Sequence, residues 1–305
     1  MMCSANAKKK VVRITNYAAA KKNLMLLTLL KLYARLPLCV IHSLGILAGW
    51  ITYFVSPRFS SRTRNNLKAS GLPQTPRQFR QLLRKSVAEA GKGMLETFAI
   101  WFRPQAQALK WVRDCHGWEH VESALSKKQG IIFLTPHLGC YEITSLYYAT
   151  QQPISVLYRP SRQAWLAPLL QAGRARGQVK LAPTNMQGVR ALLKALKQGE
   201  AVGILPDQVP GKGEGEWADF FGRPAYTMTL VSRLAEATGA TVLLAFGERL
   251  SWGRGYVLHI TPMTSAPAPA ALNNAIEQLV RLKPEQYLWG YQRHKIPHGV
   301  TPAAG

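Results

Sequence analysis

Acidic residues are scarce in this 305-residue chain, which carries 15 Asp and Glu against 39 Lys and Arg, for a formal net charge of +24. Such an excess predicts an anionic partner: nucleic acid, anionic lipid, a phosphorylated substrate or an acidic carrier protein. Cysteines are also few, and they lie far apart without a CxxC pair, which argues against a disulfide framework and a zinc site and favours reduced thiols on the cytoplasmic side. They are Cys3, Cys39, Cys115 and Cys140.

Several catalytic and binding signatures are missing from the sequence. It has no H-E-x-x-H and no G-x-S-x-G, which argues against a zinc protease and a serine hydrolase. Gly211, Gly213 and Gly215 are not followed by the GK[ST] of a P-loop. No helix-turn-helix, RRM or zinc-finger signature accompanies the basic residues, so nucleic-acid binding is an alternative that rests on net charge alone.

Charged residues are absent between Arg35 and Arg58. The apolar run at 36–55 has about the length that crosses a bilayer core, and Trp50, Tyr53 and Phe54 near its end suit an interfacial belt. We expect a membrane anchor, spanning the bilayer or lying in its interface; a long core helix is the alternative. The predicted domains are a basic N-terminus and anchor at 1–57 and a catalytic domain at 58–305. A basic cluster follows the anchor: Arg58, Arg62, Arg64 and Lys68.

Periodicity predicts one long helix and then a regular alternation of elements. The helix runs from Thr75-Pro76 to Phe102. Strand-like runs at 130–134, 154–158, 201–205, 241–246 and 256–261 alternate with helical patterns at 141–150, 163–176, 187–197, 228–238 and 271–282. This order predicts an α/β fold with parallel strands in its sheet.

The stretch at 130–142 carries the first candidate site. A buried strand is expected to end at Thr135-Pro136 and to be followed by His137 in a turn, with Glu142 in the first turn of a helix. A carboxylate bonded to one ring nitrogen fixes the tautomer and leaves the other nitrogen as a base, so we expect His137 and Glu142 to meet as a catalytic pair. The alternatives are a structural histidine and a glutamate that serves the helix dipole.

Two later strands also end in polar residues. Arg159 follows one and offers a positive fork for phosphate, carboxylate or a developing oxyanion; Asp207 and Gln208 follow the other. Ligands bind at the carboxyl ends of strands in open α/β sheets, which favours a common site there. The glycine-rich segment after Asp207, up to Gly222, is predicted to be a mobile loop that can close over a site; plain disorder at a surface tip is the alternative.

These motifs together resemble the late acyltransferases of lipid A biosynthesis, the lauroyl and myristoyl type, which are relatives of the glycerophosphate acyltransferases. The resemblance covers nearly the whole chain. Two of the usual patterns differ here, at Cys140-Tyr141 and at Tyr291-Gln292. The matched motifs are His137-x4-Glu142, Tyr158-Arg159-Pro160, Leu205-Pro-Asp207-Gln208, Phe220-Phe221-Gly222-x-x-Ala225-x-Thr227 and Gln286-Tyr-Leu-Trp289.

The resemblance implies a glycerophosphate-acyltransferase-like mixed sheet flanked by helices, with an N-terminal membrane helix. It implies transfer of an acyl chain from acyl carrier protein to a hydroxyl of a Kdo-bearing, tetra- or penta-acylated lipid A precursor. His137 would be the base and Glu142 its orienting carboxylate. Substrate-binding residues would be Arg159, Asp207, Gln208, Phe221, Gly222 and Thr227.

Partners and location follow from the same resemblance. We expect an acyl carrier protein, an anionic glycolipid acceptor and a membrane, with no nucleic acid, no metal and no cofactor. The expected place is the cytoplasmic face of the bacterial inner membrane. An alternative keeps the fold and changes the substrate to a lysophospholipid or another glycolipid, with acyl-CoA as donor.

Overall fold

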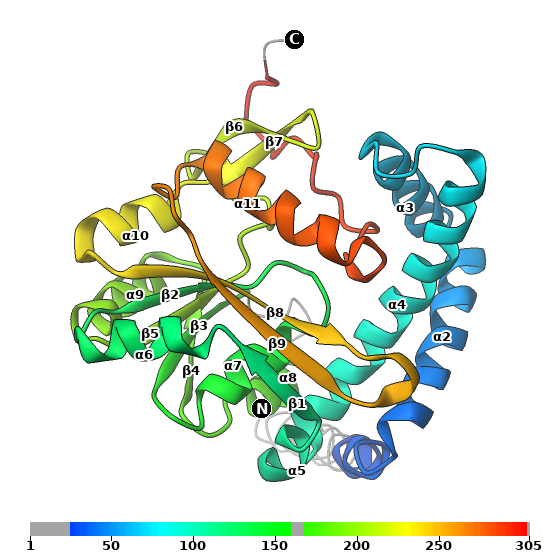
Figure 1. The fold of residues 1–305 in the computed structure, drawn as a ribbon, viewed down its shortest axis with the longest axis horizontal. Coiled ribbons are helices and arrows are strands. Elements are labelled where there is room, and N and C mark those ends of the chain that lie inside the picture. Colours follow the sequence, from blue (N-terminus) through cyan, green and yellow to red (C-terminus); the bar gives the residue numbers. More distant parts are fainter. Residues whose placement is uncertain (1–24, 160–166, 304–305) are drawn as a thin grey trace, which may run out of the picture.

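The computed structural model describes residues 25–159 and 167–303. Cys3, the basic residues at 8–22, Pro160 and the start of the helix predicted at 163–176 lie outside these ranges. A seven-stranded sheet, in the order β1-β9-β8-β2-β5-β3-β4, forms the centre of the described structure (Figure 1). All neighbouring strands are parallel except β8 and β9. The predicted α/β fold with a mixed sheet is confirmed.

The strands of this sheet are short and deeply buried in its middle. Their bounds are β1 (Val112–His116), β2 (Ile131–Leu134), β3 (Ile154–Tyr158), β4 (Val179–Pro183), β5 (Ala201–Ile204), β8 (Thr241–Arg249) and β9 (Tyr256–Pro262). Five of the seven coincide closely with predicted strands. The edge strands β1 and β4 were not predicted, because each is only five residues long and carries exposed polar or charged residues.

Helices cover both faces of the sheet, since alternate side chains of each strand point to opposite faces. On β2, Ile132 and Leu134 belong to one hydrophobic cluster, and Ile131 and Phe133 belong to another. The helices are α2 (Leu38–Val55), α3 (Pro57–Ala69), α4 (Pro76–Phe102), α5 (Gln105–Leu109), α6 (Trp118–Ser126), α7 (Tyr141–Tyr148), α8 (Ala167–Arg174), α9 (Met186–Lys197), α10 (Leu230–Thr238) and α11 (Pro269–Leu282), with short 3-10 turns η1 (Ser251–Gly253) and η2 (Pro284–Gln286).

Helix α4 begins where the sequence predicts. The Thr75 hydroxyl accepts a hydrogen bond from the Gln78 amide, and the Gln78 side chain accepts one from the Thr75 amide, which forms a capping box. Pro76 occupies the first helical position, where its missing N–H costs nothing. Both features stabilise the N-terminus of this long helix.

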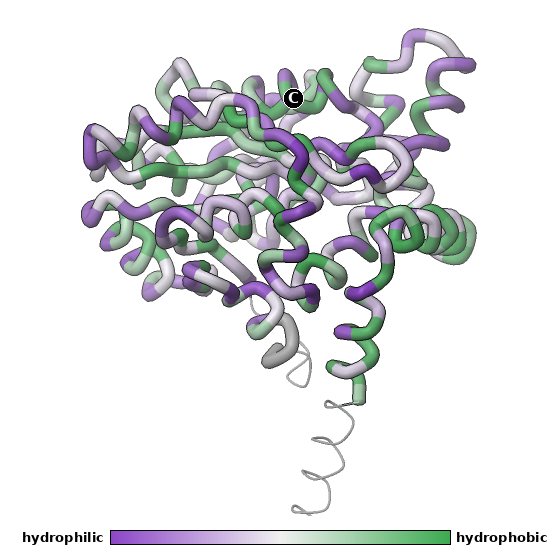
Figure 2. The backbone as a smooth tube through the Cα atoms, turned by 60° about the horizontal axis from the view of Figure 1, so that its bottom comes forward, coloured by the Kyte–Doolittle hydropathy of each residue, from purple (hydrophilic) through white to green (hydrophobic). Residues whose placement is uncertain are grey.

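The apolar helix α2 lies alongside α4 (Figure 1), and the hydropathy colouring of Figure 2 marks it as a hydrophobic segment. It is long and apolar enough to cross a membrane, with 28% of its residues buried. Its inner face is lined with glycine: a Cβ on Gly45 would lie 2.7 Å from the Lys92 Cα, and one on Gly91 would collide with the Gly45 carbonyl. The two helices therefore pack backbone against backbone. The division of the chain at residue 57 stays a prediction.

A two-stranded antiparallel hairpin comes after β5 in the chain. Its strands are β6 (Gly215–Phe220) and β7 (Arg223–Met228). The prediction of a mobile loop up to Gly222 is therefore wrong for residues 215–222. The glycines suggested a loop, yet Gly215 sits where a Cβ would lie 2.6 Å from the Thr227 carbonyl, so close strand pairing requires it. Gly222, with a φ of 67°, forms the tight turn.

Candidate active site

The carboxyl ends of β2 and β5 form the edge of the sheet that carries the candidate site. The two strands are hydrogen-bonded neighbours and run parallel. His137 and Asp207 each lie three residues after the last residue of their strand. Equal offsets on adjacent parallel strands place the two side chains beside each other. Sheet topology therefore brings together two residues that are 70 positions apart.

Asp207 binds His137 through both of its carboxylate oxygens. Oδ1 lies 2.9 Å from the ring Nδ1, and Oδ2 accepts the His137 backbone N–H at 2.9 Å. The carboxylate is fully buried, which by itself raises its pKa, but the charge and hydrogen bonds of His137 lower it below the ordinary value. In the neutral form of His137 an ionised Asp207 accepts the Nδ1 proton, and Nε2 is then the ring nitrogen that carries the lone pair.

Glu142 is not the carboxylate that holds the ring, contrary to the expectation from spacing. In the structure its Oε1 accepts hydrogen bonds from Arg174, at 3.1 Å from Nε and 2.8 Å from Nη2. The helix begins as expected, since α7 starts at Tyr141 and Glu142 lies in its first turn. The difference lies in the long-range partners: Arg174 from α8 binds Glu142, and Asp207 already occupies the Nδ1 side of the ring. Whether Glu142 is catalytic stays a prediction.

Two tyrosines enclose the imidazole of His137. Tyr291 stacks on it, with ring centroids 5.6 Å apart and planes at 16°, and Tyr141 contacts it edge-on at 5.1 Å. The Tyr291 hydroxyl accepts the Val209 N–H at 2.9 Å, two residues after Asp207. The C-terminal segment is also tied to the turn, because the Leu288 N–H donates to the His137 carbonyl at 3.0 Å. The ring is thus held on three sides, and its side chain keeps 12% of its surface exposed.

A narrow cavity of about 30 Å³ lies next to this turn, between α7, α8 and the sheet. Its polar lining residues are Thr135, Tyr141, Glu142, Thr144, Ser145 and Arg174, and the rest of its lining is apolar. Among the apolar lining residues are Phe133, Ile154, Val156, Leu157, Gly203 and Leu205. At this size the cavity holds about one water molecule, so a longer apolar ligand needs α7 or α8 to move.

The other strand-end residues lie at the same edge. Arg159 is exposed directly after β3, which pairs with β5 on the side away from β2. Burial raises the pKa of Tyr291, and the charge of Arg159 is among the smaller effects that lower it. Gln208 is half-buried beside Asp207. Their substrate-binding roles stay predictions.

Phe221, Gly222 and Thr227 belong to the hairpin. Phe221 is buried in the core cluster, with its N–H donating to Glu277 at 2.6 Å, and Gly222 is at the exposed tip. The fully buried Thr227 hydroxyl accepts from Arg293 at 2.6 Å. These contacts give all three a structural role in the hairpin; their predicted contact with substrate is untested.

Sequence reasoning missed Arg174 and missed the role of Tyr291. Arg174 comes from α8, and nothing in the linear sequence indicates that α8 packs against the start of α7. Tyr291 had a signal, because it lies two residues after Trp289 in a motif that was singled out. Within residues 25–159 and 167–303, no cluster of three or more His, Cys, Asp or Glu could hold a metal. That no cofactor is needed stays a prediction.

Comparison with known proteins gives a consistent result. A family model described as bacterial lipid A biosynthesis acyltransferase matches residues 6–296. The chain is 27% identical over 278 residues to a lipid A biosynthesis lauroyltransferase of Escherichia coli K12, covering 88% of this chain and 90% of that protein. It is 29% identical over 279 residues to a lipid A biosynthesis palmitoleoyltransferase of the same organism, covering 88% and 89%. A Haemophilus influenzae lipid A biosynthesis acyltransferase is 26% identical over 251 residues, covering 80% and 78%.

Proposed function

The chain belongs to the bacterial lipid A biosynthesis acyltransferases, O-acyltransferases that act in lipid A biosynthesis, and from this premise we propose how it works. His137 is the general base that activates a hydroxyl of the lipid A precursor, and Asp207 orients it. The observation that carries this proposal is the 2.9 Å contact between His137 Nδ1 and the fully buried Asp207 carboxylate. It leaves Nε2 as the basic nitrogen at the open edge of the sheet.

The chemistry follows from that tautomer. An alcohol is a weak nucleophile near neutral pH, so Nε2 takes its proton as the oxygen attacks the thioester carbonyl. The tetrahedral intermediate then collapses, the carbon–sulfur bond breaks, and the thiolate leaves with the proton carried by the imidazolium. Asp207 stabilises the positive ring during both steps, and stacking on Tyr291 adds to this.

Glu142 and Arg174 take a different part in this proposal. Their ion pair lines the cavity beside the base. The Arg174 side chain is 26% exposed, and its guanidinium carbon lies 4.8 Å from the centroid of the Trp101 ring. A guanidinium placed there can stabilise negative charge on the thioester oxygen, and Glu142 keeps it in place. The apolar lining residues of the cavity receive the acyl chain once α7 or α8 moves.

The donor is an acyl carrier protein in this proposal. Residues 57–88 contain eight Lys and Arg and no Asp or Glu. All eight are exposed on α3 and α4, which gives a strongly basic surface suited to an acidic carrier. They are Arg58, Arg62, Arg64, Lys68, Arg77, Arg80, Arg84 and Lys85.

The acceptor is a Kdo-bearing, tetra- or penta-acylated lipid A precursor. Arg159 binds one of its anionic groups, which its exposed position directly after β3 permits. Gln208 is placed to hydrogen-bond a sugar hydroxyl. Phe221, Gly222 and Thr227 shape the hairpin that borders the acceptor. A lysophospholipid or another glycolipid with acyl-CoA as donor is the alternative that a substrate comparison would favour.

We place the enzyme on the cytoplasmic face of the bacterial inner membrane, with α2 as its anchor. The outer face of α2 exposes a series of large apolar residues, whereas its inner face packs on α4. A helix held along its length by a catalytic domain fits best in the plane of the interface, with basic α3 near the headgroups. The exposed apolar residues are Val40, Leu44, Ile46, Leu47, Ile51, Phe54 and Val55.

The test is acyl transfer by His137→Ala with acyl carrier thioester and the Kdo-bearing precursor. Loss of the base should lower kcat by about 10²–10⁴-fold. His116→Ala is the matched control, because that side chain is 60% exposed and remote in the sheet order, on β1. Undiminished turnover in His137→Ala would contradict the proposal. Faster turnover with acyl-CoA and a lysophospholipid would favour the alternative substrate.

A further inference from the structure

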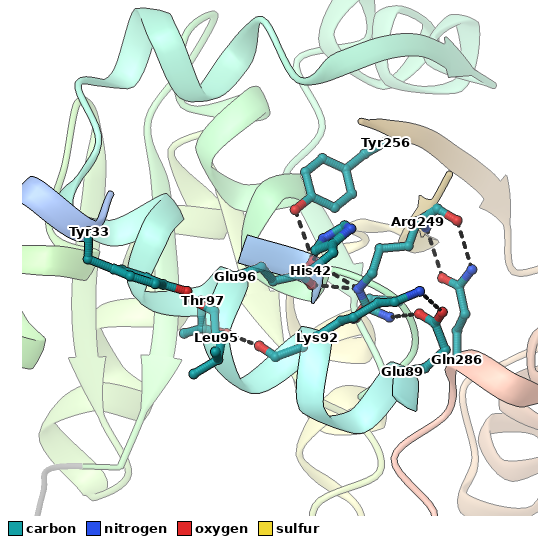
Figure 3. Close-up of polar contacts among 12 residues, drawn as sticks. Tyr33, His42, Glu89, Lys92, Leu95, Glu96, Thr97, Arg249, Tyr256 and Gln286 are labelled. Atoms are coloured by element: carbon teal, nitrogen blue, oxygen red, sulfur yellow. Dashed lines mark hydrogen bonds and ion pairs between the residues drawn. The ribbon is translucent and has the colours of Figure 1, made fainter. Parts of the chain in front are cut away.

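A second group of buried charges lies beneath α2 and α4, and Figure 3 shows its contacts. The Arg249 side chain, 3% exposed at the end of β8, donates from Nε to both oxygens of Glu96, at 2.8 and 2.9 Å. Its Nη1 donates to Glu89 at 2.9 Å. Burial raises the pKa of Glu96, but the Arg249 charge and the His42 hydrogen bond hold it at about 2. Glu96 and Arg249 therefore form a buried ion pair at the centre of this network.

Arg249 also reaches the turn that carries His137. Its Nη2 donates to the Gly139 carbonyl at 2.6 Å, two residues after the proposed base. The Gln286 side chain pairs with the Arg249 backbone in both directions, at 2.8 and 2.9 Å, and the Gln286 carbonyl accepts the Gly139 N–H at 3.1 Å. Both polar groups of Gly139 are thus fixed by Arg249 and its direct partner.

The backbone of Gly139 needs such support. Its φ is +58°, and a Cβ there would collide with the Gly247 carbonyl oxygen, which already accepts the Cys140 N–H at 2.7 Å. The turn is therefore pressed closely against β8, in a conformation that only glycine adopts readily. Only Leu138 separates Gly139 from His137, and it is fully buried, so a shift of the Gly139 carbonyl is expected to move His137 relative to Asp207.

The same network connects the turn to α2. His42 on α2 contacts Glu96 Oε2 through Nε2 at 3.0 Å, and the Tyr256 hydroxyl donates to the same oxygen at 2.9 Å. The path from α2 to the turn is therefore three side chains long: His42, Glu96 and Arg249. Burying the ion pair of Glu96 and Arg249 gains little stability compared with apolar packing, so its value lies in fixing geometry.

We propose that Arg249, held by Glu96, is a positioning residue for acyl transfer: it fixes the Gly139 carbonyl and through it the imidazole of His137, and His42 extends this support to α2. This inference rests on the proposed function, in which His137 is the base. Arg249 acts through the turn and touches no substrate.

The decisive variant is Arg249→Lys. Lysine keeps the charge beside Glu96, but a single ammonium cannot replace the guanidinium fork that serves Glu96, Glu89 and the Gly139 carbonyl together. We expect kcat at saturating substrates to fall about tenfold or more, as small misplacements of reacting groups do, with KM for both substrates changed less than twofold. A parallel fall in Glu96→Gln, smaller than in Arg249→Lys, is expected because Gln still accepts one of the Arg249 hydrogen bonds.

Arg103→Lys is the matched control. Arg103 also joins two backbone carbonyls, those of Ala34 and Leu36, at 2.6 and 3.0 Å, but these lie away from the catalytic turn. Its variant should lower the melting temperature without changing kcat more than twofold. If Arg249→Lys and Arg103→Lys lose kcat equally at equal loss of melting temperature, the positioning role is wrong. If Arg249→Lys fails to fold, Glu96→Gln against Arg103→Lys decides by the same criterion.

Failure of the proposed function would look different. Full activity in His137→Ala refutes His137 as base whatever the Arg249 variants do. An inactive His137→Ala combined with an Arg249→Lys that behaves like Arg103→Lys refutes the positioning role alone. Restoration of kcat in Arg249→Ala by millimolar guanidinium, with no such effect on Arg103→Ala, would support positioning directly.

Discussion

Two histidine–carboxylate pairs in this protein have almost the same contact distance and very different surroundings. His137 and Asp207 are 2.9 Å apart, and His42 and Glu96 are 3.0 Å apart. Glu96 is shared with Arg249 and Tyr256, and the second ring nitrogen of His42 is buried without a partner among the described residues. Asp207 binds both the ring and the backbone N–H of His137 through its side-chain oxygens, and the ring borders the open edge of the sheet. Access to substrate therefore distinguishes the chemical pair from the structural one.

The largest expected effect separates these two carboxylates. Asp207→Asn removes the acceptor that selects the Nδ1–H tautomer, and in such a triad-like arrangement the corresponding change costs about 10⁴ in kcat. Glu96→Gln changes a carboxylate of equal burial but acts only through Arg249, so its kcat should fall far less. Steady-state kinetics of both variants, with melting temperatures, make the comparison. Equal losses of kcat would erase the distinction between the two pairs.

The stability of the protein at acid pH is expected to depend on the structural pair, through Glu96. The pKa of Glu96 is about 2 in the folded protein against an ordinary value of 4.5, so its stabilising effect is present above pH 4.5 and is lost as the pH falls toward 2. Glu96→Gln should therefore be less stable than the native protein at neutral pH and should lose less stability on acidification. The measurement is the melting temperature at a series of pH values between 7 and 3.

Glu200→Gln is the control for that titration. Glu200 pairs with Lys180 at 2.9 Å, but the Lys180 side chain is 58% exposed, and solvent-exposed pairs contribute little. Its melting temperature should follow the native curve at every pH. A Glu96→Gln curve parallel to the native one would show that the network carries no pH-dependent stability.

A smaller effect is expected from Tyr291, which stacks on His137 of the chemical pair. Tyr291→Leu removes the ring stacked on His137, a contact that at a partly exposed site contributes about 0.5–1 kcal/mol to a cation, which corresponds to about a two- to fivefold fall in kcat. Tyr291→Phe keeps the ring and loses only the hydroxyl that accepts the Val209 N–H. It should retain more activity than Tyr291→Leu. The reverse order would assign the effect to that hydrogen bond.

The sequence could predict the ingredients of the site but not their pairing. Strand ends at 134, 158 and 205 were predictable from apolar runs, and with them the edge that carries His137, Arg159 and Asp207. The order of strands was not predictable, because nothing local specifies that β2 lies between β5 and β8. Spacing within the motif therefore favoured Glu142, five residues away, over Asp207, 70 residues away.

The second network was hidden for the same reason. Its members come from α2, α4, β8 and β9, and each alone reads as an ordinary surface or core residue. Burial of Glu96 was not predictable, since α4 shows charged residues along its length and its inner face is defined only once α2 packs on it through Gly45, Gly49 and Gly91. Long-range packing, rather than local propensity, determines which charges are buried.

The thiol of Cys140 can report whether the turn between the two pairs opens. This prediction concerns its rate of chemical modification and not the rate of catalysis. It lies on the turn between His137 and α7 and is 3% exposed, and burial together with the Glu96 charge raises the pKa of its thiol. In a chain with Cys3, Cys39 and Cys115 replaced by serine, a thiol reagent should modify Cys140 only slowly. Arg249→Lys should speed this modification, because a loosened Gly139 carbonyl lets the turn open, whereas Arg103→Lys and Tyr291→Phe should not. Equal rates in all three variants would mean that Arg249 does not restrain the turn.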